Sequence, residues 1–207
     1  MSSKQPLRIA VFASGSGSNF QAVADAVRAG GIDATIELLV CDKPSAYAIE
    51  RANALHIPTY VFRPKEFPSR EACEEQIVAR LRERDIDLVV LAGYMRIVTS
   101  VLVEPYYGRM INIHPALLPA FPGLDGIGQA LAYGAKITGA TVHFVDGGMD
   151  TGPIIAQRAV EVLDGDTHET LGKRIQQAEH ALLPQVVKWI AEGRVTLDGR
   201  QVTVRQG

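Results

Sequence analysis

The stretch LRIAVFASGSGSNFQAV, residues 7–23, decides the fold class, because an apolar strand pattern passes through a glycine-rich turn into a helical pattern. The run up to Ala13 is rich in branched apolar residues, as expected of a buried strand. The segment SGSGSN at 14–19 then supplies turn residues before a helix predicted over about 19–29. A strand, a tight turn and a helix form the first half of a βαβ unit, which indicates an α/β protein with a largely parallel sheet.

The same alternation continues along the chain. Further helices are predicted over about 45–55, over 69–84 with Ser69 as N-cap, and over 167–192, where one apolar stripe repeats at helical spacing. A terminal hairpin is predicted around Asp198-Gly199. Longer loops are expected at 93–98, 113–126 and 146–152, beside the rigid sheet where function usually lies. Further strands are predicted at 34–40, 59–62, 87–93, 110–113, 138–145 and 153–162.

Composition narrows the class of protein. The 207 residues favour one domain, 1–207, with halves 1–92 and 93–207. The net charge of -2, from 21 basic and 23 acidic residues, comes without a clustered basic face, so no nucleic-acid partner is expected. Since the chain has neither a signal-peptide pattern nor an apolar run of about 18 residues, we expect a cytoplasmic protein with no membrane partner. Cys41 and Cys73 are expected to be packing residues without a chemical role.

The glycine-rich turn at 14–19 has two interpretations. Glycines let backbone N–H groups approach an anion, and a helix N-terminus adds partial positive charge, so the turn suits a phosphate. It is not a dinucleotide fingerprint, since Phe20 stands where the third glycine belongs, and it lacks the Gly-Lys-Ser/Thr of a P-loop. The alternative is a tight strand-to-helix turn capped by Ser or Asn.

A polar pair lies in the stretch MINIHPALLPAFPGLDG, residues 110–126. If its start is extended, Asn112 and His114 share one side at the carboxyl end of a strand, which faces the ligand crevice in open α/β sheets. An Asn amide can donate to an oxyanion, and a His can stabilise charge or donate a proton. The pair therefore suits addition to a carbonyl, whereas the alternative is a His that caps a loop.

Two carboxylates lie in HFVDGGMDTGPII, residues 143–155. Asp146 or Asp150 near His114 would favour its charged form, which a general acid requires. Alternatively, both carboxylates bond to backbone N–H groups of a turn. A third interpretation is a metal site that combines these carboxylates with His114 and His143, but no close ligand spacing supports it, and no metal is expected.

Taken together, these segments resemble the folate-dependent formyltransferases. The resemblance is carried, in order, by SGSGSN (14–19), LAGYMRIV (91–98), NIHPALLPAFPG (112–123), HFVDGGMDTGPI (143–154) and QQAEHALLP (176–184). It implies a Rossmann-like formyltransferase fold, with a mostly parallel, twisted sheet of seven strands flanked by helices. It also implies transfer of a formyl group from the co-substrate 10-formyltetrahydrofolate to the amine of glycinamide ribonucleotide in purine biosynthesis.

The resemblance assigns roles to individual residues. The first half becomes the phosphate-binding half, and the second becomes the catalytic and folate-binding half. The expected partners are small-molecule substrates, and the expected oligomeric state is a monomer or a homodimer. The implied catalytic residues are Asn112, His114 and Asp150; the ribonucleotide residues are Gly17, Ser18, Asn19, Gln176 and Glu179; and the folate residues are Arg70, Met95, Arg96, Ile97, Val98 and Asn112.

One segment departs from the family pattern. Where many members carry His or Arg after PGL, this chain has Asp125-Gly126-Ile127-Gly128, which removes basic side chains near the expected reacting centre. Rival functions are a formyltetrahydrofolate hydrolase, another folate-dependent formyltransferase, a non-catalytic protein that binds a phosphate ligand, and a metal-dependent hydrolase. A formyltransferase acting on tRNA would need an added C-terminal domain and a basic surface.

Overall fold

The computed structural model describes residues 5–207 in two compact units, of which the first ends at Ile111 and the second is Asn112–Gly207. The units divide inside strand β5 (Met110–His114), whereas the predicted halves divide after residue 92. A single domain over 1–207 stays a prediction. The units are described separately below.

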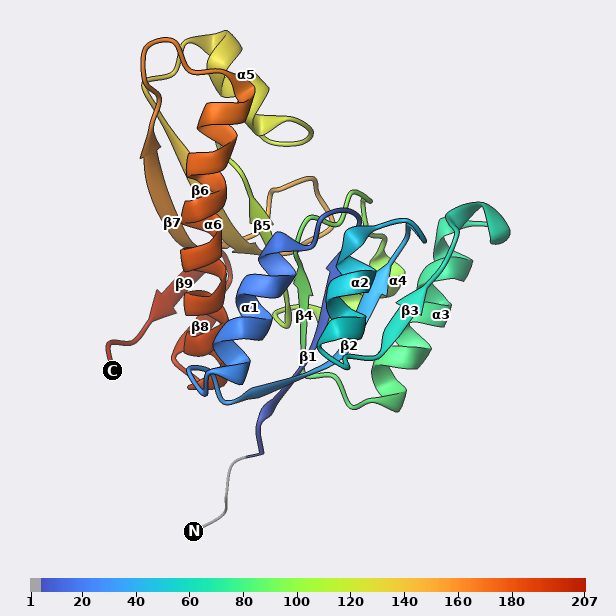
Figure 1. The fold of residues 1–207 in the computed structure, drawn as a ribbon. Helices are drawn as coiled ribbons and strands as arrows, with labels where there is room; N and C mark the ends of the chain where they lie inside the picture. The colour runs from blue at the N-terminus through green and yellow to red at the C-terminus, as the bar shows by residue number, and fades with distance from the viewer. Residues whose placement is uncertain (1–4) are drawn as a thin grey trace. The chain divides into compact units, whose positions relative to one another are not determined.

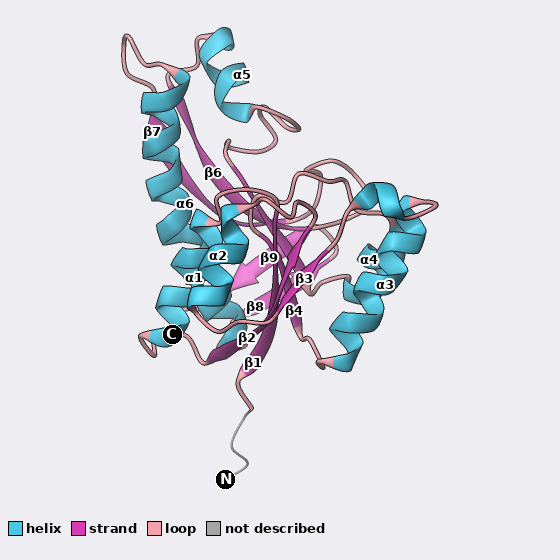
Figure 2. Ribbon diagram, turned by 45° about the vertical axis from the view of Figure 1, so that its right-hand side comes forward, coloured by secondary structure: helices cyan, strands magenta, loops and turns pink. Residues whose placement is uncertain are grey.

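The first unit is built on parallel strands (Figure 2). β1 pairs with β2 on one side and with β4 on the other, and β2 also pairs with β3. Because all of these pairings are parallel, the carboxyl ends of β1 and β4 lie at the same edge, where Ser14 N donates to Gly93 O at 3.1 Å. The bounds are β1 (Leu7–Ala13), β2 (Ala34–Cys41), β3 (Thr59–Val61) and β4 (Leu88–Leu91).

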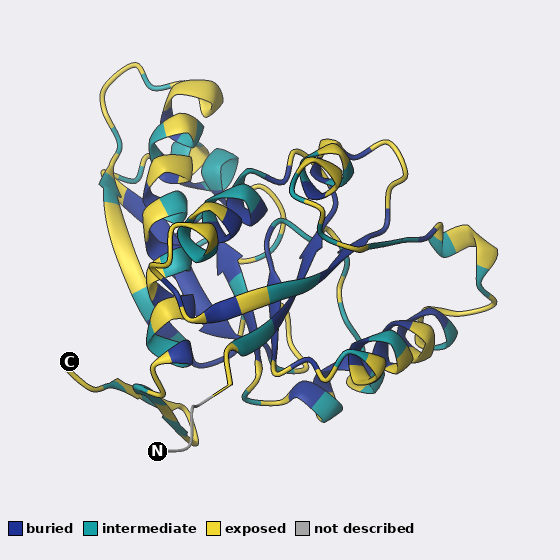
Figure 3. Ribbon diagram, turned by 60° about the horizontal axis from the view of Figure 1, so that its bottom comes forward, coloured by how far each residue is buried: buried dark blue, intermediate teal, exposed yellow. Residues whose placement is uncertain are grey.

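The three longer helices of the first unit follow the predicted ranges, and each carries both buried and exposed residues (Figure 3). The short helix at Ser100–Val103 was not predicted. The Ser69 hydroxyl accepts from Ala72 N at 3.0 Å, so the predicted N-cap is confirmed. Cys41 and Cys73 are buried and free, and burial raises the pKa of both thiols. The helices are α1 (Ser18–Arg28), α2 (Tyr47–Ala54), α3 (Arg70–Glu83) and α4 (Ser100–Val103), with 3₁₀ turns η1 (Pro64–Glu66) and η2 (Glu104–Tyr106).

The second unit packs the long helix α6 (His168–Ala191) along the antiparallel strands β6 (Ile137–Phe144) and β7 (Ile154–Glu161) (Figure 1). The predicted stripe faces inward, since its five residues are buried: Leu171, Ile175, Ala178, Leu182 and Val186. The terminal hairpin is also present as β8 (Val195–Asp198) and β9 (Gln201–Val204).

Across the described residues, one sheet of seven strands has the order β3-β2-β1-β4-β5-β6-β7. This order confirms the predicted mostly parallel sheet of seven strands, with β7 as an antiparallel edge strand. Helix α5 (Gly126–Tyr133) was not predicted, because its sequence GIGQALAY begins with two glycines in three residues, and glycine is a poor helix former. Among residues 5–207, no helix is long and apolar enough to cross a membrane.

Candidate active site

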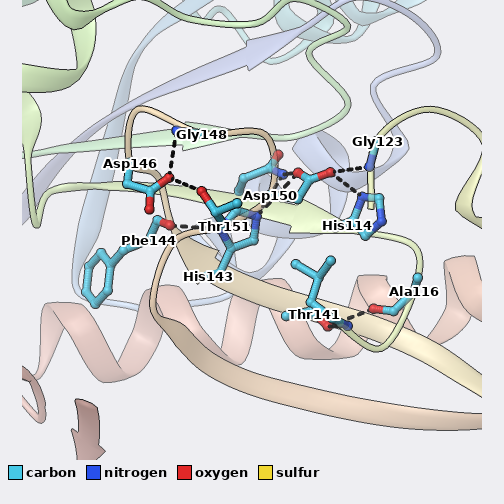
Figure 4. Close-up of polar contacts among 12 residues, drawn as sticks. His114, Ala116, Gly123, Thr141, His143, Phe144, Asp146, Gly148, Asp150 and Thr151 are labelled. Atoms are coloured by element: carbon cyan, nitrogen blue, oxygen red, sulfur yellow. Dashed lines mark hydrogen bonds and ion pairs between the residues drawn. The ribbon is translucent and has the colours of Figure 1, made fainter. Parts of the chain in front are cut away.

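The second unit brings together the three side chains predicted to be catalytic. Strand β5 carries Asn112 and His114, and the loop between β6 and β7 carries Asp150. The His114 Nδ1 atom lies 3.4 Å from Asp150 Oδ2 (Figure 4), and Asn112 Nδ2 donates to Asp150 Oδ1 at 3.4 Å. A carboxylate, an imidazole and an amide therefore form one network, which sequence spacing alone could not establish.

His114 is buried, and each of its ring nitrogens faces an acceptor. Nδ1 faces Asp150, and Nε2 lies 2.8 Å from the carbonyl oxygen of Phe121. Because a carboxylate and a carbonyl only accept hydrogen bonds, the arrangement suits an imidazolium that carries hydrogen on both nitrogens. Gly126 allows this approach, since a Cβ there would lie 3.3 Å from Nε2 of His114.

Asp150 is held in its charged form. Burial by itself raises the pKa of this carboxyl, but the nearby His143 ring, the hydrogen bond from Gly123 N and the charge of His114 together lower the pKa below its usual value. Gly123 N donates to Oδ2 at 2.8 Å. At neutral pH, Asp150 is therefore a carboxylate beside His114. A negative charge at this position favours the charged imidazole, which is the form that a general acid needs.

His143 belongs to the same network, although the sequence suggested only a metal ligand for it. Its Nδ1 donates to the carbonyl of Phe144 at 2.8 Å, and its Nε2 lies 3.2 Å from Asn112 Nδ2 and 3.7 Å from Asp150 Oδ1. The contact with Asn112 helps to fix which way that amide points. The sequence signal that could have identified this role is a histidine inside the buried strand pattern TVHFV, where a polar ring without a hydrogen-bond partner is costly. No group of three or more His, Cys, Asp or Glu in residues 5–207 is placed to hold a metal ion.

The loop after β5 is held by polar contacts from its neighbours. The buried Thr141 hydroxyl donates to Ala116 O at 2.7 Å and accepts from Leu118 N at 3.1 Å. The Gln129 amide nitrogen donates to Pro122 O at 3.0 Å and Leu124 O at 2.8 Å. These contacts fix the loop whose Phe121 carbonyl and Gly123 amide meet His114 and Asp150.

The departure at 125–128 has a local explanation. Asp125 is the N-cap of α5, and its Oδ1 accepts from Gly128 N at 3.0 Å and from His168 Nε2 at 2.7 Å. Both contacts lower the pKa of the carboxyl, with the Gly128 bond contributing most. A larger residue at Gly128 would displace the capping carboxylate, because a Cβ there would lie 2.1 Å from Asp125 Oδ2. In this chain the segment therefore caps α5 and links it to the first residue of α6.

In the first unit, the glycine-rich turn closes tightly onto α2. Gly17 has φ +70°, and a Cβ on it would lie 2.7 Å from the Cβ of Ala48. Gly17 is also the N-cap of α1 and makes no side-chain cap bond, so the alternative of a turn capped by Ser or Asn is not met. Arg51 Nε donates to Ser16 O at 2.8 Å and holds the turn from α2. Ser18 and Asn19 are the first two residues of α1.

The predicted folate loop, 93–98, follows β4 in the first unit. The Ser14 hydroxyl accepts from Met95 N at 2.9 Å, and Arg70 donates to Ile97 O at 3.4 Å. Two apolar side chains of this loop are nevertheless exposed, Met95 at 64% and Ile97 at 51%. Arg96 and Val98 are half-buried. The loop is thus anchored through its backbone while it presents apolar side chains to solvent.

The remaining predicted residues lie on α6 in the second unit. Gln176 is exposed and Glu179 is half-buried. Since they are three residues apart on one helix, their side chains lie on the same face.

Comparisons with known proteins agree with this geometry. Residues 7–187 match a family model described as formyl transferase. The chain is 52% identical over 181 residues to a phosphoribosylglycinamide formyltransferase of Bacillus subtilis, covering 87% of this chain and 93% of the relative. The structure of glycinamide ribonucleotide transformylase 1 from Symbiobacterium toebii matches with a TM-score of 0.96 at 44% identity, covering 98% of this chain and 95% of that one.

A formyltetrahydrofolate deformylase from Pseudomonas syringae pv. tomato also shares the fold, with a TM-score of 0.91 at 27% identity, covering 98% of this chain and 67% of that one. The deformylase is thus a more distant relative than the transformylases by identity and by coverage. With a family model matching over residues 7–187 and a relative at 52% identity, this chain belongs to the formyl transferase family.

Proposed function

We propose that Asn112, His114 and Asp150 transfer the formyl group of 10-formyltetrahydrofolate to the amine of glycinamide ribonucleotide, a reaction of purine biosynthesis. The observation that carries the proposal is the 3.4 Å contact between His114 Nδ1 and Asp150 Oδ2 in a family member 52% identical to a phosphoribosylglycinamide formyltransferase. A charged imidazole beside a half-buried amide is suited to acyl transfer, in which negative charge develops on a carbonyl oxygen.

The reaction divides into attack and collapse. The amine of the ribonucleotide attacks the formyl carbon, and the formyl oxygen becomes an oxyanion in a tetrahedral intermediate. His114 stabilises this charge as the imidazolium that Asp150 maintains. Asn112 donates its second N–H, because the contact of that group with Asp150 is long, 3.4 Å, and yields to a stronger acceptor. On collapse the bond to the folate nitrogen breaks, that nitrogen gains a proton, and the attacking amine loses one. Asp150 and ordered water assist this proton transfer.

Gly17, Ser18 and Asn19 are proposed to hold the phosphate of the ribonucleotide. In support, these residues lie at the N-terminus of an 11-residue helix, whose partial positive charge favours an anion. Gly17 leaves this end of the helix without a Cβ, and a larger residue than Gly17 would collide with Ala48. Gln176 and Glu179 are proposed to bind the ribose hydroxyls of the same substrate.

The folate is proposed to contact the segment Met95, Arg96, Ile97 and Val98, together with Arg70 and Asn112. The support is physical: exposed Met95 and Ile97 suit a flat pterin ring, and backbone groups between them suit its polar edge. The guanidinium groups of Arg70 and Arg96 suit the carboxylates of the folate's glutamate. The cytoplasmic location and the monomeric or homodimeric state stay predictions.

The test is an assay of the purified protein with both substrates, in which tetrahydrofolate and the formylated ribonucleotide are measured together. Equal amounts of the two products, and no tetrahydrofolate when the ribonucleotide is omitted, are expected. Release of tetrahydrofolate and formate without the ribonucleotide would instead identify the deformylase activity of the distant relative. Absence of both products would contradict the proposal.

A further inference from the structure

The loop that carries Asp150 has an unfavourable backbone conformation at that residue. Asp150 has φ +54°, in the left-handed region that non-glycine residues rarely adopt. Such a conformation persists only where the surrounding structure holds it. The contacts that hold this loop therefore decide where the Asp150 carboxylate lies.

One set of stabilising contacts lies within the loop between β6 and β7 (Figure 4). Asp146 Oδ1 accepts from Gly148 N at 3.0 Å and from the Thr151 hydroxyl at 2.7 Å. These two bonds give Asp146 a structural role in the turn, whereas the sequence left open whether Asp146 is catalytic or stabilises a turn. The side chain of Thr151, the residue after Asp150, is thereby fixed.

A second hold comes from the terminal hairpin. Arg200 lies in the tight turn between β8 and β9, and its Nη2 donates to the carbonyl of Thr151 at 2.9 Å. The hairpin itself is anchored, since β9 contacts β7 and the opposite end of the hairpin is tied to Gly193 by Arg205. The Arg200 guanidinium thus extends from a fixed turn to the residue that follows Asp150.

We propose that Arg200 is a positioning residue for the formyl transfer: it holds the Thr151 carbonyl so that Asp150 stays against His114 and Gly123. The proposal rests on the proposed function of Asp150. The 3.4 Å separation of His114 and Asp150 is already long for a charged contact, so a small shift of the loop weakens it. Thr151, fixed at both its hydroxyl and its carbonyl, transmits the position of the hairpin to Asp150.

The experiment compares Arg200→Ala, Arg200→Lys and a matched control, Arg205→Ala, in the full chain. Arg205 belongs to the same hairpin, but its guanidinium donates to Gly193 O at 2.6 Å, away from the loop. Three quantities are measured for each protein: kcat and the KM of each substrate, hydrogen exchange of the Gly123 amide, and the midpoint of thermal unfolding. The Gly123 amide reports on Asp150 because it donates to that carboxylate at 2.8 Å.

For Arg200→Ala we expect kcat to fall and exchange at Gly123 to accelerate, each by about two- to tenfold, the range of a single hydrogen bond. Both KM values are expected to stay within about twofold of the wild type, since no substrate contact is removed. Lysine should recover most of the loss by donating to the same carbonyl, and Arg205→Ala should leave kcat and Gly123 exchange unchanged.

Unchanged kcat and Gly123 exchange in Arg200→Ala would overturn the inference. So would an equal fall in Arg205→Ala, because the effect would then follow from the hairpin in general. If the wild-type protein transfers no formyl group, the proposed function fails, whereas the exchange measurement still tests the positioning role.

Discussion

Replacing Asp150 by Asn removes the charge beside His114 while keeping the shape of the side chain. The Gly123 amide can still donate to the remaining oxygen, so the loop is expected to keep its conformation. The amide of Asn cannot stabilise the imidazolium as a carboxylate does. The Asp150→Asn substitution therefore isolates the electrostatic contribution of Asp150 to the reaction.

The distance between His114 and Asp150 determines how far the turnover number should fall. At the 3.4 Å between His114 Nδ1 and Asp150 Oδ2, two opposite unit charges attract by about 5 kcal/mol at an effective dielectric constant of about 20. Burial of the carboxylate offsets part of this attraction, and an opposite charge at such a distance stabilises a charged group by about 1.4–4 kcal/mol net. The turnover number should therefore fall by about ten- to a thousandfold.

The assay is the steady-state rate of formyl transfer, with kcat and the KM of the ribonucleotide measured for wild type and Asp150→Asn. The matched control is Asp164→Asn, since the Asp164 side chain is 98% exposed and forms an ion pair with the exposed Lys136. The control should behave as wild type, and the KM for the ribonucleotide should change little in both proteins. A kcat for Asp150→Asn within twofold of wild type would refute the assigned role of the carboxylate.

Three further predictions concern binding and stability. Gly17→Ala should destabilise the protein by more than about 1–2 kcal/mol, the cost of a left-handed non-glycine residue alone, because the added Cβ also collides with Ala48, and it should weaken ribonucleotide binding. Chemical unfolding and calorimetric titration measure both effects, with Gly15→Ala, whose added Cβ meets nothing within 4 Å, as the stability control. His168→Ala should lower the midpoint of thermal unfolding, because it removes the 2.7 Å contact with the Asp125 cap. Since Asp125→Ala already removes this contact together with the Gly128 cap bond, adding His168→Ala to it should cause little further loss, and additive losses would contradict the coupling. The hydrogen bond from Arg174, followed by those from Leu163 N and Thr170, lowers the pKa of Asp166 in the folded protein. The stabilisation by this carboxylate is therefore complete above its unfolded pKa of about 4 and is lost as the pH falls through the lower folded pKa. The difference in unfolding midpoint between wild type and Asp166→Asn should shrink on acidification, and a constant difference would be inconsistent with the lowered pKa.

Much of the fold follows from periodicity and turn residues. The strand at 7–13 and the stripe of α6 could be predicted because one burial pattern explains each of them. Helix α5 could not, because its stability comes from the Asp125 cap, the contact with His168 and the packing of Gly126 near His114. The contacts with His168 and His114 join residues far apart in sequence, which local propensity does not contain.

The candidate site shows the same division. Asn112 and His114 could be placed on one side of a strand from the two-residue period alone. The approach of Asp150 could not, since it depends on the loop conformation set by Asp146, Thr151 and Arg200. The role of His143 was missed because its tautomer is fixed by a backbone carbonyl, which no residue pattern records.

A comparison of formyl transfer and ribonucleotide binding in wild type and His114→Ala tests most directly whether His114 is catalytic. We expect turnover to fall by about a hundred- to ten-thousandfold, the range of a lost acid or charge-stabilising group, while the dissociation constant of the ribonucleotide changes little. A His114→Ala protein that transfers the formyl group at the wild-type rate would contradict the catalytic role of His114.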